Sequence, residues 1–495
     1  MRSDSPISGR TTYAAIWLIA SRLGTRFIDF ALLLILARML TPADFGIVAV
    51  AMTLIQITEA VFELPVGQVL VRAQHITRPM LNTAFTLGAI RGVGLAVLLA
   101  AASLPFASFY GDPRLAPLIC FLSLAPALRG LLSPKMACFA QAMDFRRDVA
   151  VEMGGKICAI LIAAISAVIT HSYWAIALGT VMTPAAMVVI SYVLAPFSPR
   201  LSLGERKTFV GYLGWTTAAQ AVSAINWKLD GLVLGRLVSH TQLGAFSLAS
   251  DMSYLPEQAV VKPVVGPLLS AFSLIRSDPD RLAQAYLKSA NMILHVGLPI
   301  MVGLSVLAEP AIRLALGPKW QAAAPYLQWL ALTLIPPLFT APLGSLAMAL
   351  GRPRTFLNQN LAELAVKLPA TFIGVALFGV YGAIGARAVS TSTTCIVTAW
   401  MVRQMAGVPM LQQLLSPWRS ILAGLALAAL LFELRTLLAP LHDVQLAFGL
   451  AACAAAGLAA YGFVLLGLWV LAGRPAGVES RVISTAVGLL SRRRG

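Results

Sequence analysis

Three charged side chains share one face of the first long apolar stretch of this sequence. Arg22, Arg26 and Asp29 are spaced i, i+4 and i+7, which places them on one side of a helix. If that helix begins near Tyr13, Arg26 lies about 20 Å along it, too deep in a membrane to reach the interface. Two arginines outnumber the one acid. We therefore expect this face to line a cavity, where guanidinium groups can hold phosphate oxygens bidentately.

Carboxylates inside other apolar stretches form a second class of candidate. Glu59 and Glu63 lie in the second stretch, and Asp251 and Glu257 lie in the eighth. A carboxylate in a low-dielectric site can take up and release a proton during a transport cycle. The candidates for ion or proton coupling are Asp29, Glu59, Glu63, Asp251 and Glu257. A solvated position near the end of a span would explain these carboxylates equally well.

Three more cations interrupt apolar stretches: Arg91 in the third, Lys228 in the seventh and Arg387 in the twelfth. A charge at mid-membrane costs at least about 2.5–3.5 kcal/mol, so each should face a cavity or an opposite charge. Pairing among neighbours is the alternative to a cavity role, for example between Lys228 and Asp251.

Two glutamate–lysine pairs have i, i+4 spacing, which favours mutual ion pairs on one helix face. They are Glu152 with Lys156 in the fifth stretch and Glu363 with Lys367 in the eleventh.

The elements that carry these charges are expected to be membrane-spanning helices. The chain has 495 residues, of which 58% are hydrophobic and only 12% are charged, and its mean hydropathy is +0.81. Soluble domains carry about 25% charged residues, so a soluble enzyme is excluded. Apolar stretches of about 20 residues recur throughout, each long enough to span a bilayer. The first one contains charges that no cleavable signal peptide would tolerate. We predict fourteen spans: 13–37, 42–66, 81–107, 115–140, 147–170, 173–195, 210–236, 242–270, 288–312, 323–349, 355–378, 381–403, 418–439 and 444–471.

Basic residues predict the orientation of these spans. Every second connection is rich in Lys and Arg, for example at Arg72 and Arg78, at Arg146 and Arg147, and at Arg352. Cytoplasmic connections carry this excess, so both termini are expected to be cytoplasmic. The net charge of +17 follows largely from this topology. The run 492–494 of the tail would be attracted to anionic lipid headgroups.

One motif occurs twice in the chain. Leu36-Ala37-Arg38 is followed by Gly46, and Leu234-Gly235-Arg236 is followed by Gly244, with a constant offset of 198 residues. Six spans separate the copies, so the two halves should cross the membrane in the same direction. Such parallel repeats are typical of transporters. The expected organisation is an N-lobe over 1–205, a C-lobe over 206–405, two further spans over 406–471 and a basic cytoplasmic tail over 472–495.

The sequence contains no catalytic or metal-binding pattern. The sequence holds no nucleotide-binding, nucleophile-elbow or zinc-protease motif. Its five cysteines are scattered in apolar segments without CxxC spacing, so they should be small core residues. We expect no catalytic residues, no metal, no cofactor and no binding of nucleic acid.

Several motifs resemble those of the polysaccharide transport family, the Wzx-type flippases of the multidrug/oligosaccharidyl-lipid/polysaccharide exporter superfamily. The motifs are 36–46, 144–147, 173–175, 230–236 and 243–244. The resemblance implies an all-α fold, with two six-helix lobes in a V-shaped arrangement like that of multidrug and toxin extrusion proteins. It also implies transfer of undecaprenyl-diphosphate-linked oligosaccharides across the bacterial inner membrane. Membrane lipids are expected partners, and the last two spans would either carry an interface with polysaccharide polymerase and chain-length machinery or pack against the C-lobe.

Under this resemblance the cations acquire a specific role, because the diphosphate is anionic. The residues expected to bind it are Arg22, Arg26, Arg91, Lys228 and Arg387. A small-molecule exporter of the multidrug and toxin extrusion type remains an alternative, but cationic drugs would require carboxylates in the cavity. A membrane enzyme of envelope assembly is a third possibility, although such enzymes need a longer periplasmic loop than the one around 310–322.

Overall fold

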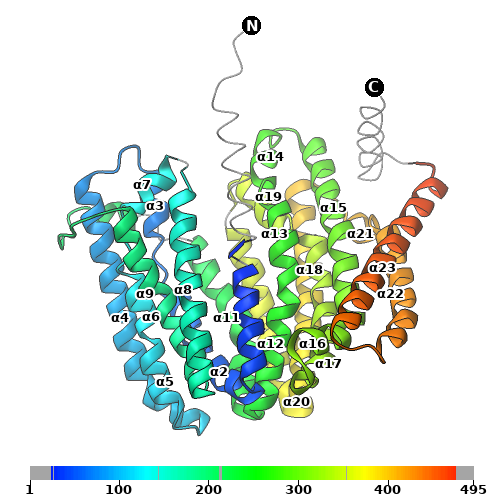
Figure 1. Cartoon of the computed structure of the whole chain (residues 1–495). Helices are drawn as coiled ribbons and strands as arrows, with labels where there is room; N and C mark the ends of the chain where they lie inside the picture. Colours follow the sequence, from blue (N-terminus) through cyan, green and yellow to red (C-terminus); the bar gives the residue numbers. More distant parts are fainter. Residues whose placement is uncertain (1–23, 26, 143, 211–214, 353, 475–495) are drawn as a thin grey trace, which may run out of the picture. The chain divides into compact units, whose positions relative to one another are not determined.

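The computed structural model describes residues 24–25, 27–142, 144–210, 215–352 and 354–474 (Figure 1). This part of the chain is helical and contains no strand, which confirms the expected all-α fold. The chain divides into two compact units, Met1–Gly244 and Ala245–Gly495.

The first unit is a bundle of long helices joined by short ones. A helix over 27–39 precedes the labelled elements. These are α2 (Pro42–Val61), α3 (Val66–Arg72), α4 (Arg78–Tyr110), α5 (Leu115–Leu122), α6 (Leu124–Arg129), α7 (Met136–Gln141), α8 (Arg146–Thr170), α9 (Trp174–Leu194), α10 (Arg206–Val210), α11 (Trp215–Leu237) and the first turn of α12 (His240–Pro256).

The second unit holds the rest of α12 and the helices that follow it. They are the π-helix η1 (Glu257–Val261), α13 (Lys262–Val265), α14 (Leu268–Leu274), α15 (Pro279–Val306), α16 (Ala308–Leu316), η2 (Pro318–Trp320), α17 (Ala323–Thr333), α18 (Ile335–Thr340), α19 (Leu343–Ala349), α20 (Arg354–Ala406), α21 (Met410–Leu415), α22 (Trp418–Leu434), η3 (Arg435–Leu438) and α23 (Asp443–Leu471).

Helices cover the predicted spans wherever the structure describes them; residues 13–23 of the first span and 475–495 of the expected basic tail lie outside the described residues. Among the described residues, nine helices are long and apolar enough to cross a membrane. One of them, α20, contains Gly379 with φ of 56°, a kink that separates the eleventh span from the twelfth. Shorter helices joined by breaks form the fourth, eighth and tenth spans. The chain is therefore a multi-pass helical membrane protein.

Helix α2 has a capped N-terminus, and its C-terminus is followed by a break in the helix. The Thr41 hydroxyl accepts a hydrogen bond from the Asp44 N–H, while the Asp44 carboxylate accepts one from the Thr41 N–H. Pro42 occupies the first helical position, where its missing N–H costs nothing. After Val61 the helix stops, and it resumes as α3 beyond Pro65.

Each unit contains an edge-on aromatic pair at a similar place along its half of the chain. In the first unit Phe121 meets Trp174 edge-on, with ring centroids 5.5 Å apart and planes at 74°. In the second, Tyr326 meets Tyr381 at 5.5 Å and 72°. Each pair joins the fourth predicted span of its half to the sixth. Both halves thus place an aromatic contact between the corresponding pair of predicted spans.

The last two predicted spans pack into the second unit. Leu427 and Leu431 of α22 share a buried cluster with Leu298 and Met301 of α15, and Tyr461 of α23 joins the same cluster. The expected lobe boundary at 205 stays a prediction. In the structure α11 packs on α2, and the first unit extends to Gly244.

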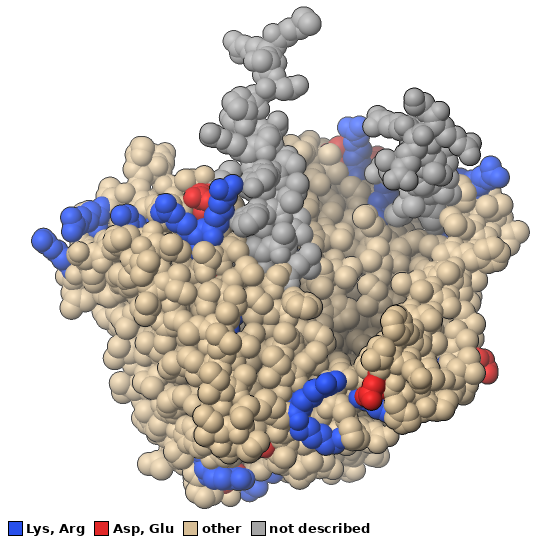
Figure 2. Space-filling model, viewed as in Figure 1, with Lys and Arg blue, Asp and Glu red and all other residues tan. Residues whose placement is uncertain are grey.

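Charge is distributed unevenly over the first unit. On the face shown in Figure 2, most Lys and Arg gather at the end of the bundle that carries α3 and α7, a smaller group lies at the opposite end, and the flanks between are almost uncharged. This end corresponds to the basic connections that the sequence places in the cytoplasm.

Candidate functional site

The break between α2 and α3 brings three charged residues together. Arg129, at the end of α6, donates from Nη1 to both carboxylate oxygens of Glu59, at 2.8 and 2.7 Å. Arg91 of α4 donates from Nε to the Phe62 carbonyl at 2.7 Å and from Nη2 to the Glu59 carbonyl at 2.9 Å. Arg91 thereby satisfies carbonyls that the end of α2 leaves without helical partners.

Both arginines keep hydrogen-bond donors for a further group. Within the described residues, Nη1 of Arg91 and both Nε and Nη2 of Arg129 have no protein acceptor. The Arg129 side chain is 46% exposed, whereas that of Glu59 is 16% exposed. Glu63, in the turn after α2, is close enough for its charge to act on the Arg91 guanidinium. The cluster thus contains two cations and two carboxylates.

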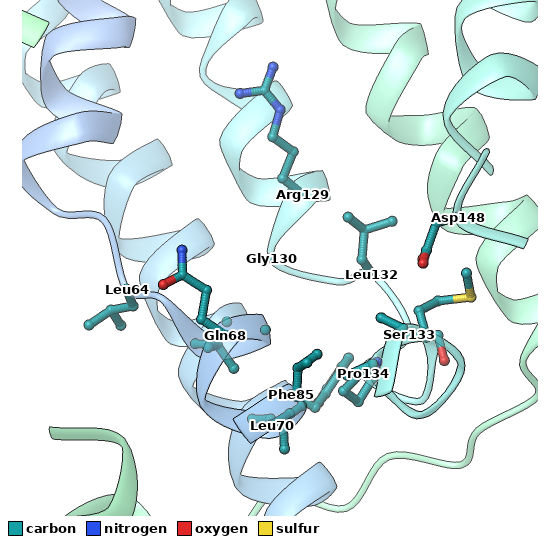
Figure 3. A pocket seen from close by; sticks show the side chains of 18 of the residues that line it. Leu64, Gln68, Leu70, Phe85, Arg129, Gly130, Leu132, Ser133, Pro134 and Asp148 are labelled. Atoms are coloured by element: carbon teal, nitrogen blue, oxygen red, sulfur yellow. The ribbon is translucent and has the colours of Figure 1, made fainter. Parts of the chain in front are cut away.

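These arginines line a cavity of about 760 Å³ within the first unit, here called the Arg129 cavity. Its volume is in the range of pockets that bury a drug-sized ligand, about 300–1,000 Å³. Apolar side chains make up most of its wall. Its polar and charged side chains are Gln68, Arg72, Arg91, Arg129, Ser133 and Asp148. In Figure 3 the Arg129 side chain extends away from the apolar group formed by Leu70, Phe85 and Pro134.

A second charged group links the first span to α8. Lys156 Nζ lies 2.8 Å from Asp29 Oδ2 and 3.4 Å from Glu152 Oε1. The expected i, i+4 pair of Glu152 and Lys156 is therefore confirmed, and Asp29 is a further partner that the sequence did not indicate. The predicted coupling role of Asp29 remains a prediction.

In the second unit, Arg387 is buried among aromatic rings. Its side chain is only 4% exposed, and its Nη1 donates to Ser250 Oγ at 3.2 Å. Its guanidinium lies 5.6 Å from the ring centre of Phe246 and 5.7 Å from that of Tyr254. These contacts suit a cation–π role in packing.

The remaining predicted site residues are dispersed. Arg22 and Arg26 lie outside the described residues. Lys228 is partly buried on α11, Asp251 is exposed on α12, and Glu257 belongs to the π-helix η1. The diphosphate-binding and coupling roles expected for them remain predictions.

Arg129 is the residue that the sequence analysis missed. A signal was present, because Arg129 interrupts the predicted span 115–140 between Pro126 and Gly130. Arg91 was singled out as a cation within an apolar span, and the same criterion selects Arg129, which shares its predicted span with Lys135.

The family is decided by a match over more than half of the chain. Residues 35–325 match the family model described as polysaccharide biosynthesis protein. The chain belongs to this polysaccharide biosynthesis family. The cavity, the α2 break and the repeated motif that includes Gly46 and Gly244 all lie within the matched range.

Relatives in this family come from several bacteria. The succinoglycan biosynthesis transport protein ExoT of Rhizobium meliloti is 26% identical over 64% of this chain and 65% of its own length. The lipopolysaccharide biosynthesis protein WzxC of Escherichia coli is 24% identical over 78% of this chain and 79% of its own length.

Solved transporter structures share the fold. The lipid II flippase MurJ, in an inward closed conformation, matches with a TM-score of 0.73 at 14% identity, over 91% of this chain and 98% of that chain. An inward-facing multidrug resistance transporter of the MATE family, in the MOP superfamily, matches with a TM-score of 0.64 at 14% identity, over 79% of this chain and 98% of that one. At this identity the likeness establishes the fold alone.

Proposed function

We propose that this protein is a flippase for undecaprenyl-diphosphate-linked oligosaccharides in the bacterial inner membrane. The Arg129 cavity is the observation that carries the proposal, because it combines guanidinium donors with an apolar wall inside a membrane bundle. Its family supports the same role, since one relative is named as a succinoglycan transport protein. The fold it shares with a lipid II flippase is compatible with it.

The transported lipid presents a physical problem that this site can solve. A diphosphate and its sugars cannot enter hydrocarbon unaided, because the loss of hydration is too costly. Guanidinium groups replace water at the phosphate oxygens and can bind two of them at once. We assign this role to Arg91 and Arg129, with Arg22, Arg26, Lys228 and Arg387 retained as predicted contributors along the path.

Transport would proceed by alternating access, with the path opening to each side of the membrane in turn. Glu59, Glu63, Asp29, Asp251 and Glu257 are proposed to couple the cycle to an ion or a proton. The protein would act as a transporter and not as an enzyme, with both termini in the cytoplasm. Polysaccharide polymerase and chain-length machinery are its proposed partners.

Deletion of the gene in its host tests the function. We expect loss of a surface polysaccharide and accumulation of lipid-diphosphate oligosaccharide on the cytoplasmic side, both reversed by the wild-type gene. Normal polysaccharide together with increased sensitivity to cationic drugs would contradict the proposal and favour a multidrug exporter.

A further inference from the structure

The ion pair between Arg129, which lines the cavity, and Glu59 uses only part of the guanidinium group. Arg129 holds Glu59 through Nη1 alone, and its Nε and Nη2 have no acceptor among the described residues. Arg91, by contrast, is anchored through two of its three nitrogens to the backbone at the end of α2. Arg129 is therefore the guanidinium that can change partner without uncapping a helix.

The charges around the pair indicate what would replace Glu59. Arg91 and Arg129 balance Glu59 and Glu63, and Arg72 and Asp148 add one charge of each sign to the cavity wall. An anion added to this balanced cluster must compete with a carboxylate for a cation. Phosphate oxygens are suited to that competition, because guanidinium binds them in the same forked geometry as it binds a carboxylate.

We propose that the Arg129 cavity binds the diphosphate end of a polyprenyl lipid, and that Arg129 exchanges Glu59 for phosphate when this lipid binds. The inference rests on the proposed function and adds to it the residue that binds and the one that is displaced. Glu59 is then the internal counter-ion that holds Arg129 in place while the cavity is empty.

The wall of the cavity favours an isoprenoid chain over the sugars. Leu64, Val71, Phe85, Leu132 and Met136 line it. The Ser133 hydroxyl is already committed, since it donates to the Ala195 carbonyl at 2.8 Å. Along this apolar part of the wall, sugar hydroxyls would lose their hydration without gaining hydrogen-bond partners. We therefore place the oligosaccharide outside this cavity.

Binding to the purified full-length protein in detergent tests the proposal, with farnesyl diphosphate as the probe. Farnesol, inorganic diphosphate and phosphatidylglycerol serve as competitors. Arg129→Gln should weaken binding at least about tenfold, while Glu59→Gln should strengthen it by releasing Arg129. The double variant with both Glu59→Gln and Arg129→Gln loses one charge of each sign, so it should fold like the wild type. It should still bind the probe weakly, because Arg129 is absent.

A steric variant tests the cavity independently of charge. Gly67 lines the cavity, and a Cβ added there would meet nothing within 4 Å, so Gly67→Leu should fill the space without disturbing the backbone. Gly94 is an exposed helical glycine with equally open surroundings that does not line the cavity. Gly67→Leu should abolish probe binding, and Gly94→Leu should leave it unchanged.

Four results would overturn the inference. Equal competition by phosphatidylglycerol would make this a general phospholipid site, and equal competition by inorganic diphosphate would make it an anion site without recognition of the chain. Unchanged affinity in Glu59→Gln and Arg129→Gln would show that Arg129 does not exchange Glu59 for phosphate. If both single variants and Gly67→Leu also restore polysaccharide in the deletion strain, the cavity assignment fails while the flippase function stands.

Discussion

Gly46 and Gly244 lie against each other's backbone in a reciprocal contact. A Cβ on Gly46 would overlap the backbone of His240, and a Cβ on Gly244 would overlap the Pro42 carbonyl and come within 2.9 Å of the Gly46 nitrogen. Both Gly46 with Gly244 and Pro42 with His240 are 198 residues apart. The two copies of the repeated motif therefore meet through equivalent positions. Glycine is needed at both, because no other residue allows the backbones to approach so closely.

Substitution of either glycine by alanine should destabilise the protein. Because the obstructing atoms belong to the backbone, they cannot move aside as a side chain would. Gly46→Ala and Gly244→Ala should each cost about 1–3 kcal/mol, the usual range for overpacking. Thermal unfolding in detergent, followed by size-exclusion chromatography, measures this loss. Gly94→Ala is the control and should unfold like the wild type; equal melting of all three variants would refute the contact.

The contacts of Lys156 with Asp29 and Glu152 predict that exchanging the charges at positions 29 and 156 rescues folding. Lys156→Asp would place like charges beside Asp29 and Glu152 inside the membrane bundle, so we expect a large fall in the yield of folded protein. Adding Asp29→Lys gives the aspartate introduced at position 156 an opposite charge to pair with. The double variant should therefore recover part of the yield. Fluorescence of a fused reporter on size-exclusion chromatography provides the measurement. A double variant no better than the single one would show that the Asp29 contact contributes nothing.

Arg387 should be sensitive to shape as well as to charge. Lysine keeps the charge, but it lacks the planar group that lies over Phe246 and Tyr254. Arg387→Lys should lower stability by about 0.5–2 kcal/mol, the range of a buried cation–π contact. The melting temperature of the purified variant tests this. Ser250→Ala removes only the hydrogen bond to Arg387, so it measures that loss separately from the loss of the ring contacts. Unchanged melting together with lost transport would instead favour the predicted role in diphosphate binding.

The connection between α4 and α5 should make stability depend on pH. Arg114 donates to the Asp112 carboxylate at 2.8–3.2 Å, and this hydrogen bonding lowers the pKa of Asp112 below its ordinary value of 3.8. His240 Nε2 lies 3.0 Å from the same carboxylate. Because the folded state favours the ionised form, this stabilisation is present above pH 3.8 and is lost as the pH falls through the lower folded-state pKa.

Comparison with Asp112→Asn isolates that contribution. The wild type should melt at a higher temperature than the variant near neutral pH, and the difference should shrink as the pH falls below 3.8. A difference that stays constant across this range would mean that ionisation of Asp112 does not contribute.

The fold was accessible from the sequence because it depends on local and periodic features. Apolar stretches, prolines and basic connections are read along the chain, and the kink at Gly379 falls at the expected join of two spans. The i, i+4 pair of Glu152 and Lys156 is equally local. The repeat was visible because its two copies keep a constant spacing.

The partners of the site residues were not accessible in the same way. Glu59 and Arg129 are 70 residues apart, and Asp29 and Lys156 are 127 residues apart. Their pairing depends on which helices pack together and on how far the α2 break displaces the chain. A single sequence indicates that such charges need partners, but it does not say which acid meets which base.

Reconstitution tests the central claim most directly. Purified protein in liposomes that contain a polyprenyl-diphosphate-linked oligosaccharide should make lipid from the inner leaflet accessible to a membrane-impermeant, sugar-modifying reagent. We predict transfer well above that of empty liposomes and a marked loss in Arg129→Gln. Transfer no faster than in empty liposomes, with correctly folded protein, would contradict the account.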